Sequence, residues 1–292
     1  MKNWRPFTAV LTALALLAGC VSLDERQRAW IFQPSDRSWG AGEAAAQGME
    51  DIWIGFQAEG QDPPVRLHGL WLPAKPQPAA GKAPVLLYLH GARYNVTGSA
   101  PRMRRMQELG FSVLAIDYRG FGKSTQALPS EASAYEDARA AWDWLAKKYP
   151  DSPRYIFGHS LGGSIAINLA TEVADESGTI VESTFTSIAD VVSSSKWGWM
   201  PVSLLITQRF EAVRKVGHIG SPLLVVHGEE DQLILPDLGR KLFEAAAQPK
   251  QFVLVPGGSH HNTNALGQEQ YRAALTGLFG HGQGIAPAST VR

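Results

Sequence analysis

A serine in the middle of the chain stands where its hydroxyl can act as a nucleophile. The apolar, strand-like run 154–158 leads into the segment GHSLG at 158–162, which begins a helix pattern of small residues. In a Gly-x-Ser-x-Gly turn the backbone passes so sharply from strand to helix that the hydroxyl of Ser160 is exposed at a sheet edge. The pattern arises easily by chance in a chain with 29 glycines, and an ordinary helix N-cap serine is the alternative. Its meaning therefore depends on partners elsewhere in the chain.

Two later loops supply those partners. The apolar run 221–227 ends in a turn that contains Asp231, and the run 250–255 ends in a turn that contains His260. A serine hydroxyl is a poor nucleophile at neutral pH, so an imidazole must accept its proton and a carboxylate must orient the imidazole. The order serine, acid, histidine along the chain therefore predicts a catalytic triad of Ser160, Asp231 and His260.

A tetrahedral intermediate also needs two backbone N–H donors for its oxyanion. Leu161 directly follows the predicted nucleophile and would donate one of them. Ala92 lies in the turn after the apolar run 84–90 and would donate the other. Reading His90 and Gly91 as a plain strand-ending turn is compatible with this role, because the turn itself provides the donor geometry.

Six segments occur in the order found in a known family. They are LYLHGARYN (87–95), IDYRGFGKS (116–124), GHSLGG (158–163), VESTFTS (181–187), HGEEDQLI (227–234) and PGGSHHN (256–262). Together they resemble the α/β-hydrolase superfamily, in particular a branch with membrane-tethered acyl-protein thioesterases in eukaryotes and serine hydrolases in bacteria. The resemblance covers most of the chain and implies an α/β-hydrolase fold. It assigns the triad to Ser160, Asp231 and His260. It assigns the oxyanion donors to Ala92 and Leu161.

Two positions of this assignment stay open. His261 stands directly after His260, where the family usually has a small polar residue, and is the rival for the base. Glu182 ends another apparent strand and is the rival for Asp231, because in some α/β-hydrolases the acid follows that strand. The structural alternative for Glu182 is that it holds the following turn in place.

Several other functions are excluded. The segment GKST at 122–125 resembles the end of a P-loop, but Asp117 stands where the first glycine is required. The eight histidines have no metal-binding spacing and the single cysteine cannot build a thiolate site, so neither a metal nor another cofactor is expected. The formal net charge of zero gives no attraction for nucleic acid.

The elements that would position these residues alternate between strand and helix. Two strands near 51–57 and 65–72 are expected to form an antiparallel start to the sheet, and 178–181 reads as a further strand. The main apolar runs are 84–90, 111–116, 154–158, 221–227 and 251–255, and helical patterns at 131–149 and 163–174 separate some of them. This alternation predicts an α/β protein with a mainly parallel sheet and helices on both faces.

The first residues read as a bacterial export signal. Lys2 and Arg5 precede the apolar run 7–18, which is short for a membrane span but typical of a secretory signal peptide covering residues 1–19. The run ends in Leu-Ala-Gly-Cys, which resembles the lipobox of bacterial lipoproteins, so Cys20 is predicted to carry lipid. A plain signal peptide with a coincidental cysteine is the alternative.

Lipid on Cys20 would anchor the chain to a membrane of the bacterial cell envelope. Val21 and Ser22 follow the cysteine in place of Asp, which favours the outer membrane facing the periplasm if the organism is Gram-negative. Residues 20–40 are expected to form a short tether. Its part at 28–34 resembles a family segment that lies against the domain.

The hydrolase domain is expected at residues 41–280, followed by a disordered tail at 281–292. Residues 185–219 form the longest insertion at the predicted active-site edge, where a lid usually sits in this fold. Its apolar residues are expected to line an acyl pocket of limited depth; they are Trp197, Trp199, Met200, Pro201, Leu204, Leu205, Ile206 and Phe210. The alternative is that 202–213 is an amphipathic helix packed on the domain.

Three functions are compatible with these features. The first is a lipid-anchored hydrolase of ester or thioester bonds in a small-molecule or acylated-protein substrate, for example one carrying palmitate. The second is a serine peptidase, which would need a group that binds the substrate amine or carboxylate. The third is a noncatalytic envelope scaffold, against which the intact Ser160, Asp231 and His260 argue, since a scaffold needs none of them.

Overall fold

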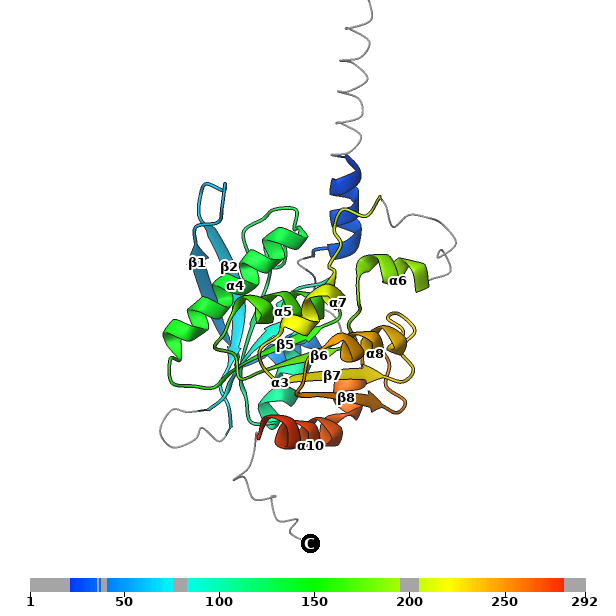
Figure 1. Ribbon diagram of the computed structural model, residues 1–292. Helices are drawn as coiled ribbons and strands as arrows, with labels where there is room; N and C mark the ends of the chain where they lie inside the picture. The colour runs from blue at the N-terminus through cyan, green and yellow to red at the C-terminus, as the bar shows by residue number, and fades with distance from the viewer. Residues whose placement is uncertain (1–21, 36, 38–40, 76–82, 195–204, 281–292) are drawn as a thin grey trace, which may run out of the picture.

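A single mixed sheet organises the molecule. The computed structural model describes residues 22–35, 37, 41–75, 83–194 and 205–280. The sheet has eight strands in the order β1-β2-β4-β3-β5-β6-β7-β8 (Figure 1). The strands are β1 (Glu50–Phe56), β2 (Val65–Leu72), β3 (Val85–Leu89), β4 (Ser112–Ile116), β5 (Arg154–His159), β6 (Gly178–Glu182), β7 (Leu223–Gly228) and β8 (Lys250–Val255). β1 and β2 pair antiparallel with their neighbours, whereas β3 to β8 run parallel, so the predicted mainly parallel sheet is confirmed.

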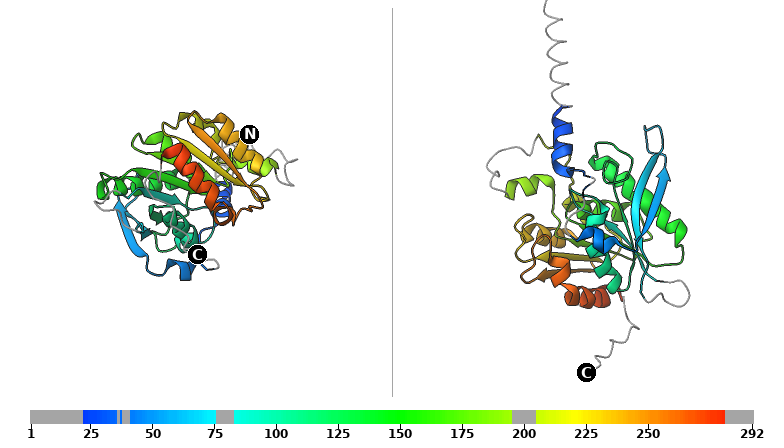
Figure 2. Two further views of the ribbon diagram at one scale, coloured as in Figure 1. Left: turned by 90° about the horizontal axis from the view of Figure 1, so that it is seen from below. Right: turned by 180° about the vertical axis from the view of Figure 1, so that it is seen from behind.

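Helices cover both faces of this sheet (Figure 2). The longer ones are α3 (Ala100–Glu108), α4 (Glu131–Lys148), α5 (Leu161–Glu172), α8 (Pro236–Ala245) and α10 (Gln268–Phe279). α4, α5 and α8 pack on one face through side chains such as Trp142, Ile165 and Leu242, and α3 and α10 pack on the other through Met103 and Tyr271. Because both faces are covered, β3 to β7 are buried along their whole length. This double burial explains why they read as continuous apolar runs.

Shorter helices lie in the loops around the sheet, several of them near the carboxyl edge of the strands. They are α2 (Gly42–Ala46), η1 (Val96–Ser99), α6 (Ile188–Ser194), α7 (Ala212–Lys215), η3 (Val216–His218) and α9 (Thr263–Leu266). The carboxyl ends of β5, β6, β7 and β8 meet at this edge, so the loops that follow them bring distant parts of the sequence together.

Residues 22–32 form a further helix, at the top of Figure 1, that is fastened to the domain at its end. Phe32 is fully buried, with its ring 5.8 Å from that of Phe210. The Arg28 guanidinium donates a 2.9 Å hydrogen bond to the carbonyl of Pro129. The segment 28–34 thus lies against the domain. Among the residues described, no helix has both the length and the apolarity needed to cross a membrane.

Candidate active site

Ser160 occupies the sharp turn between β5 and α5. Its backbone has φ 56° and ψ −122°, a conformation that a non-glycine residue adopts only when the surrounding structure imposes it. The flanking glycines explain how the turn fits, because a Cβ at Gly158 would overlap the carbonyl of Gly162. The Ser160 N–H donates a 2.9 Å hydrogen bond to the carbonyl of Glu182 on the neighbouring strand β6. The turn is therefore held from both sides with the hydroxyl at the sheet edge.

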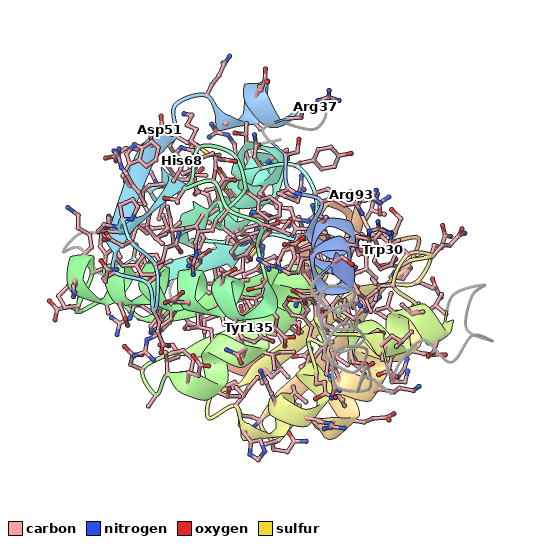
Figure 3. All side chains as sticks on the ribbon, turned by 90° about the horizontal axis from the view of Figure 1, so that it is seen from above. Trp30, Arg37, Asp51, His68, Arg93 and Tyr135 are labelled. Atoms are coloured by element: carbon pink, nitrogen blue, oxygen red, sulfur yellow. The ribbon has the colours of Figure 1, made fainter. Side chains whose placement is uncertain are left out.

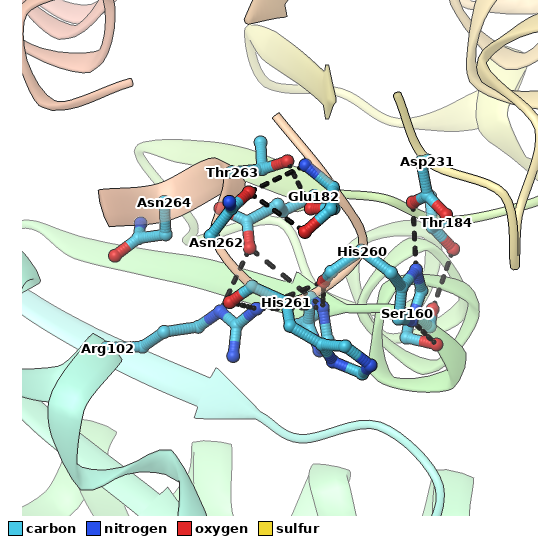
Figure 4. Close-up of polar contacts among 12 residues, drawn as sticks. Arg102, Ser160, Glu182, Thr184, Asp231, His260, His261, Asn262, Thr263 and Asn264 are labelled. Atoms are coloured by element: carbon cyan, nitrogen blue, oxygen red, sulfur yellow. Dashed lines mark hydrogen bonds and ion pairs between the residues drawn. The ribbon is translucent and has the colours of Figure 1, made fainter. Parts of the chain in front are cut away.

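The structure brings Ser160, His260 and Asp231 together in one chain of hydrogen bonds (Figure 4). The His260 Nε2 atom lies 3.0 Å from Ser160 Oγ, and its Nδ1 atom lies 2.8 Å from Asp231 Oδ2. Asp231 is on the loop after β7, and His260 is on the loop after β8. When the ring nitrogen Nδ1 donates to the carboxylate, Nε2 is left to accept the serine proton.

The carboxylate of Asp231 is buried but well supplied with hydrogen bonds. Its Oδ1 atom accepts from the backbone N–H groups of Leu233 at 3.0 Å and Ile234 at 2.9 Å. Burial alone would raise the pKa of Asp231, but hydrogen bonds from His227 and His260 outweigh burial and hold the pKa below its ordinary value. Asp231 is therefore a stable anion in position to orient the His260 ring.

The two rival residues lie elsewhere. His261 is exposed, and its ring stands edge-on to that of His260 with the centroids 5.3 Å apart. The Glu182 side chain is fully buried and bonds to the Arg102 guanidinium and the Tyr271 hydroxyl. The ring that contacts Ser160 Oγ is therefore that of His260, and the Glu182 carboxylate is engaged with Arg102 and Tyr271.

The loop after β3 brings Ala92 to the site. Ala92 and Leu161 both line the cavity into which Ser160 opens. Leu161 is the first residue of α5, where a helix leaves its N–H groups without intrahelical partners. The loop after β3 is held in place four residues beyond Ala92, where the N–H of Val96 donates a 2.6 Å hydrogen bond to the Asp117 carboxylate. Both residues predicted to donate to an oxyanion therefore lie beside the cavity of Ser160.

The cavity at Ser160 has a volume of about 580 Å³ and two kinds of wall. One wall is apolar and comes from the 22–32 helix, the loop after β6, α6 and the loop after β7; its residues are Trp30, Ile31, Phe185, Ile188, Val191, Val192, Leu233 and Ile234. The other is polar and cationic and comes largely from α3 and the loop after β3; it includes Arg93, Asn95, Ser99, Arg102 and Arg105. Seen from above, Trp30 lies on the 22–32 helix and Arg93 lies next to that helix (Figure 3).

None of the described residues that were expected to line the acyl pocket lines the cavity. Trp197, Trp199, Met200, Pro201 and Leu204 lie outside the described residues. Leu205, Ile206 and Phe210 are described but are not among the lining residues. Phe210 instead packs against Phe32 and Tyr135, with both ring centroids 5.8 Å away. It is part of the core, so the expectation that it lines the pocket is wrong.

The alternative of one amphipathic helix over 202–213 is also wrong for the part that the structure describes. Residues 206–211 are not helical, and α7 begins only at Ala212. Phe210 has a φ of 46°, which is incompatible with a right-handed helix. Sequence reasoning missed the apolar wall on α6, although Ile188, Val191 and Val192 have the i, i+3, i+4 spacing of a helix face.

Within the described residues, no group of three or more His, Cys, Asp and Glu side chains could hold a metal ion. Cys20, the predicted lipidation site, lies outside those residues, as does the predicted tail 281–292.

Several known proteins are similar to this chain in sequence and in fold. Residues 81–210 match the Hydrolase_4 family, described as serine aminopeptidase, S33. The uncharacterized protein Rv2307c of Mycobacterium tuberculosis is 31% identical over 269 residues, which cover 91% of this chain and 92% of that protein. The lysophosphatidylserine lipase ABHD12 of Danio rerio is 34% identical over 187 residues, covering 57% of this chain and 48% of the lipase.

Solved structures agree with the fold seen here. The Pyrococcus furiosus esterase Pf2001 superposes with a TM-score of 0.64 at 19% identity, over 85% of this chain and 98% of the esterase. The strand order, the turn at Ser160 and these relatives lead to one conclusion. The chain belongs to the α/β-hydrolase superfamily and is a hydrolase.

Proposed function

We propose that this protein is a serine hydrolase that cleaves carboxylic ester or thioester bonds of acyl substrates through an acyl-enzyme intermediate. The observation that carries the proposal is the continuous hydrogen-bond chain from Asp231 through His260 to Ser160, which opens into a cavity with an apolar wall. In this proposal Ser160 is the nucleophile, His260 the base and Asp231 the acid.

The reaction would proceed in two halves. Ser160 Oγ attacks the acyl carbon while its proton moves to His260 Nε2, and the N–H groups of Ala92 and Leu161 stabilise the negative oxygen of the tetrahedral intermediate. The bond to the alcohol or thiol then breaks, and His260 returns the proton to the leaving group. Water, activated by the same imidazole, releases the acid from Ser160. Asp231 stays ionised throughout and stabilises the imidazolium.

A peptidase is the competing function, because the matching family is described as a serine aminopeptidase. An aminopeptidase must bind the positively charged amino terminus of its substrate, for which a carboxylate is the natural partner. Among the described residues, no Asp or Glu lines the cavity, whereas three arginines do. This charge balance disfavours a substrate ammonium group. The apolar wall and the lipase name of ABHD12 favour an acyl chain instead.

We also propose that Cys20 carries lipid and holds the enzyme at a membrane of the bacterial envelope, the outer membrane in a Gram-negative organism. The lipobox-like sequence before Cys20 supports this proposal. The 22–32 helix begins two residues after the cysteine and packs directly on the domain, so the tether would be short. The cavity would then lie close to the lipid surface.

Fluorophosphonate labelling tests the proposed activity, followed by hydrolysis of p-nitrophenyl esters of graded chain length. Wild-type protein should label and turn over esters, and Ser160→Ala should do neither while unfolding at nearly the same temperature. Ser194→Ala, on the exposed end of α6, is the matched control and should label like wild type. Labelling that persists in Ser160→Ala would refute Ser160 as the nucleophile, and a wild-type protein that never labels would favour the scaffold.

A further inference from the structure

The cationic wall of the cavity has more positive charge than the proposed reaction uses. Arg93, Arg102 and Arg105 line the cavity together with three histidines, and no acidic residue in the described part of the chain lines it with them. Helix α3 contributes both Arg102 and Arg105, three residues apart and so on one face of that helix. The charge is therefore concentrated at one side of the cavity.

Arg102 already has an anionic partner. Its Nε atom donates to Glu182 Oε1 at 2.9 Å, and its Nη2 atom donates to the carbonyls of His260 and His261. Burial works against the charge of Arg102, but the adjacent Glu182 carboxylate outweighs burial and raises the pKa of the guanidinium. The charge of Arg102 is therefore already paired with Glu182, and its hydrogen bonds hold the loop that contains His260.

Arg105 has no such partner. Its Nε atom donates to the side-chain oxygen of Asn264 at 2.8 Å, which is a neutral amide. Among the described residues, no carboxylate lies within the 4.0 Å of an ion pair with its guanidinium. Burial and the nearby charge of Arg102 outweigh the longer-range attraction of Glu182 and Glu108 and lower the pKa of Arg105. A half-buried guanidinium with a neighbouring like charge and no carboxylate at ion-pair distance gains free energy when an anion binds to it.

The apolar wall and the cationic wall lie on opposite sides of the carboxyl edge of the sheet. Ile188, Val191 and Val192 of α6 belong to the hydrophobic core on the face of α4 and α5, whereas α3 packs on the opposite face. A bound acyl substrate can therefore place its chain against α6 and its remaining half against α3. The leaving alcohol or thiol is the part that would reach Arg105.

We propose that Arg105 binds an anionic group, phosphate or carboxylate, carried by the alcohol or thiol half of the acyl substrate, with Arg93 assisting from the rim. This inference rests on the proposed hydrolase function and narrows its substrates to anionic amphiphiles. The planar guanidinium offers paired N–H donors that match two oxygens of either anion. A neutral ester would leave those donors without an anionic partner.

Matched substrates test this assignment. The three probes share one decanoyl chain and differ in the leaving half: decanoyl glycerol, decanoyl glycerol phosphate and the decanoyl ester of glycerate. Wild-type protein should prefer both anionic esters. Arg105→Gln should lower the ratio of kcat/KM for anionic to neutral ester by about tenfold or more, the size expected for one charge-assisted contact. Arg105→Lys should retain part of the preference.

Arg104→Gln is the matched control, because Arg104 lies on the same helix but donates to the carbonyl of Ala45 away from the cavity. It removes the same charge and should keep the wild-type ratio. If Arg104→Gln lowered the anionic-to-neutral ratio of kcat/KM as much as Arg105→Gln, the preference would come from the overall positive charge of the helix. That result would overturn the assignment. A ratio unchanged in Arg105→Gln would overturn it as well.

Equilibrium binding separates this inference from the proposed reaction. Ser160→Ala should bind decanoyl glycerol phosphate more tightly than decanoyl glycerol, and adding Arg105→Gln should abolish the difference even though neither protein turns over. Inorganic phosphate alone should compete weakly, which would distinguish a substrate headgroup from a site for free phosphate. Tight binding of inorganic phosphate to Arg105 would overturn the substrate assignment. Failure to label Ser160 would contradict the hydrolase without changing these binding results.

Discussion

Arg102 and Glu182 form a buried ion pair that connects the turn at Ser160 to the loop that contains His260. Arg102 Nε lies 2.9 Å from Glu182 Oε1, and the carboxylate is fully buried. The Glu182 carbonyl accepts the N–H of Ser160, while Arg102 Nη2 donates to the carbonyl of His260 at 3.3 Å. The pair thus fixes the relative position of Ser160 and His260, which are 100 residues apart in the sequence. Glu182 has the contacts of a positioning residue.

Glu182→Gln should therefore reduce stability more than it changes the chemistry of the site. Removing one partner of a buried ion pair costs about 3–5 kcal/mol, because the other charge remains buried without compensation. We expect a lower unfolding midpoint in urea and a moderate loss of kcat at temperatures where the variant is folded. An inactive but stably folded Glu182→Gln beside an active Asp231→Asn would instead make Glu182 the acid.

The triad assignment predicts unequal effects at two neighbouring histidines. His260→Ala should lower kcat by about 10³- to 10⁴-fold or more, because the proton acceptor for Ser160 is lost. Asp231→Asn should cause a loss of similar size, since the imidazole then loses its orienting anion. His261→Ala should stay within a few-fold of wild type. Steady-state kinetics with one ester decide the question, and an inactive His261→Ala beside an active His260→Ala would reverse the assignment.

His68 makes a pH-dependent contribution to stability. Its ring lies between two carboxylates, 2.9 Å from Asp117 and 2.5 Å from Asp51, and Figure 3 shows it beside Asp51. Burial opposes the charge on His68, but the two carboxylates outweigh burial and raise the pKa above the ordinary 6.5. A raised pKa means that the folded state favours the protonated ring, so the stabilisation is complete below 6.5 and is lost at higher pH.

The difference in unfolding free energy between wild type and His68→Gln should thus shrink as pH rises above the ordinary histidine pKa. Urea unfolding from about pH 5.5 to about pH 9 measures this difference. Asp51→Asn is the control, because it removes one of the two carboxylates and should weaken the same trend. A difference that is constant over the range would show that His68 acts through packing alone.

The predicted anchor is tested by one substitution. Cys20→Ser should move the protein from the membrane fraction to a soluble form or an unlipidated precursor, and should remove metabolic fatty-acid label. The purified Cys20→Ser protein should hydrolyse p-nitrophenyl esters at the wild-type rate, because the proposed triad lies on the folded domain. Fatty-acid label that persists on Cys20→Ser would contradict the lipobox assignment.

The parts of the site that the sequence predicts are those with local signatures. Ser160 lies in a turn whose glycines are dictated by close approach of strand and helix. The strand before Asp231 reads as a buried run, and the strand before His260 reads as an apolar strand. The ion pair of Arg102 with Glu182 has no such signature, because its partners lie on different elements 80 residues apart. Around Phe210 the sequence has a helix pattern, but no helix forms there because tertiary packing of Phe210 against Phe32 overrides it.

The apolar wall on α6 should set the acyl chain length. Ile188 is buried and lines the cavity, so Ile188→Trp would fill space that a long chain needs. We expect this variant to lower kcat/KM for p-nitrophenyl decanoate relative to acetate by about tenfold, or about 1.4 kcal/mol of transition-state binding. Trp197→Ala and Trp199→Ala should shift the profile the opposite way if those side chains also close the pocket. An unchanged profile in Ile188→Trp would place the acyl chain against another wall, whereas a uniform loss for both esters would indicate a distorted site.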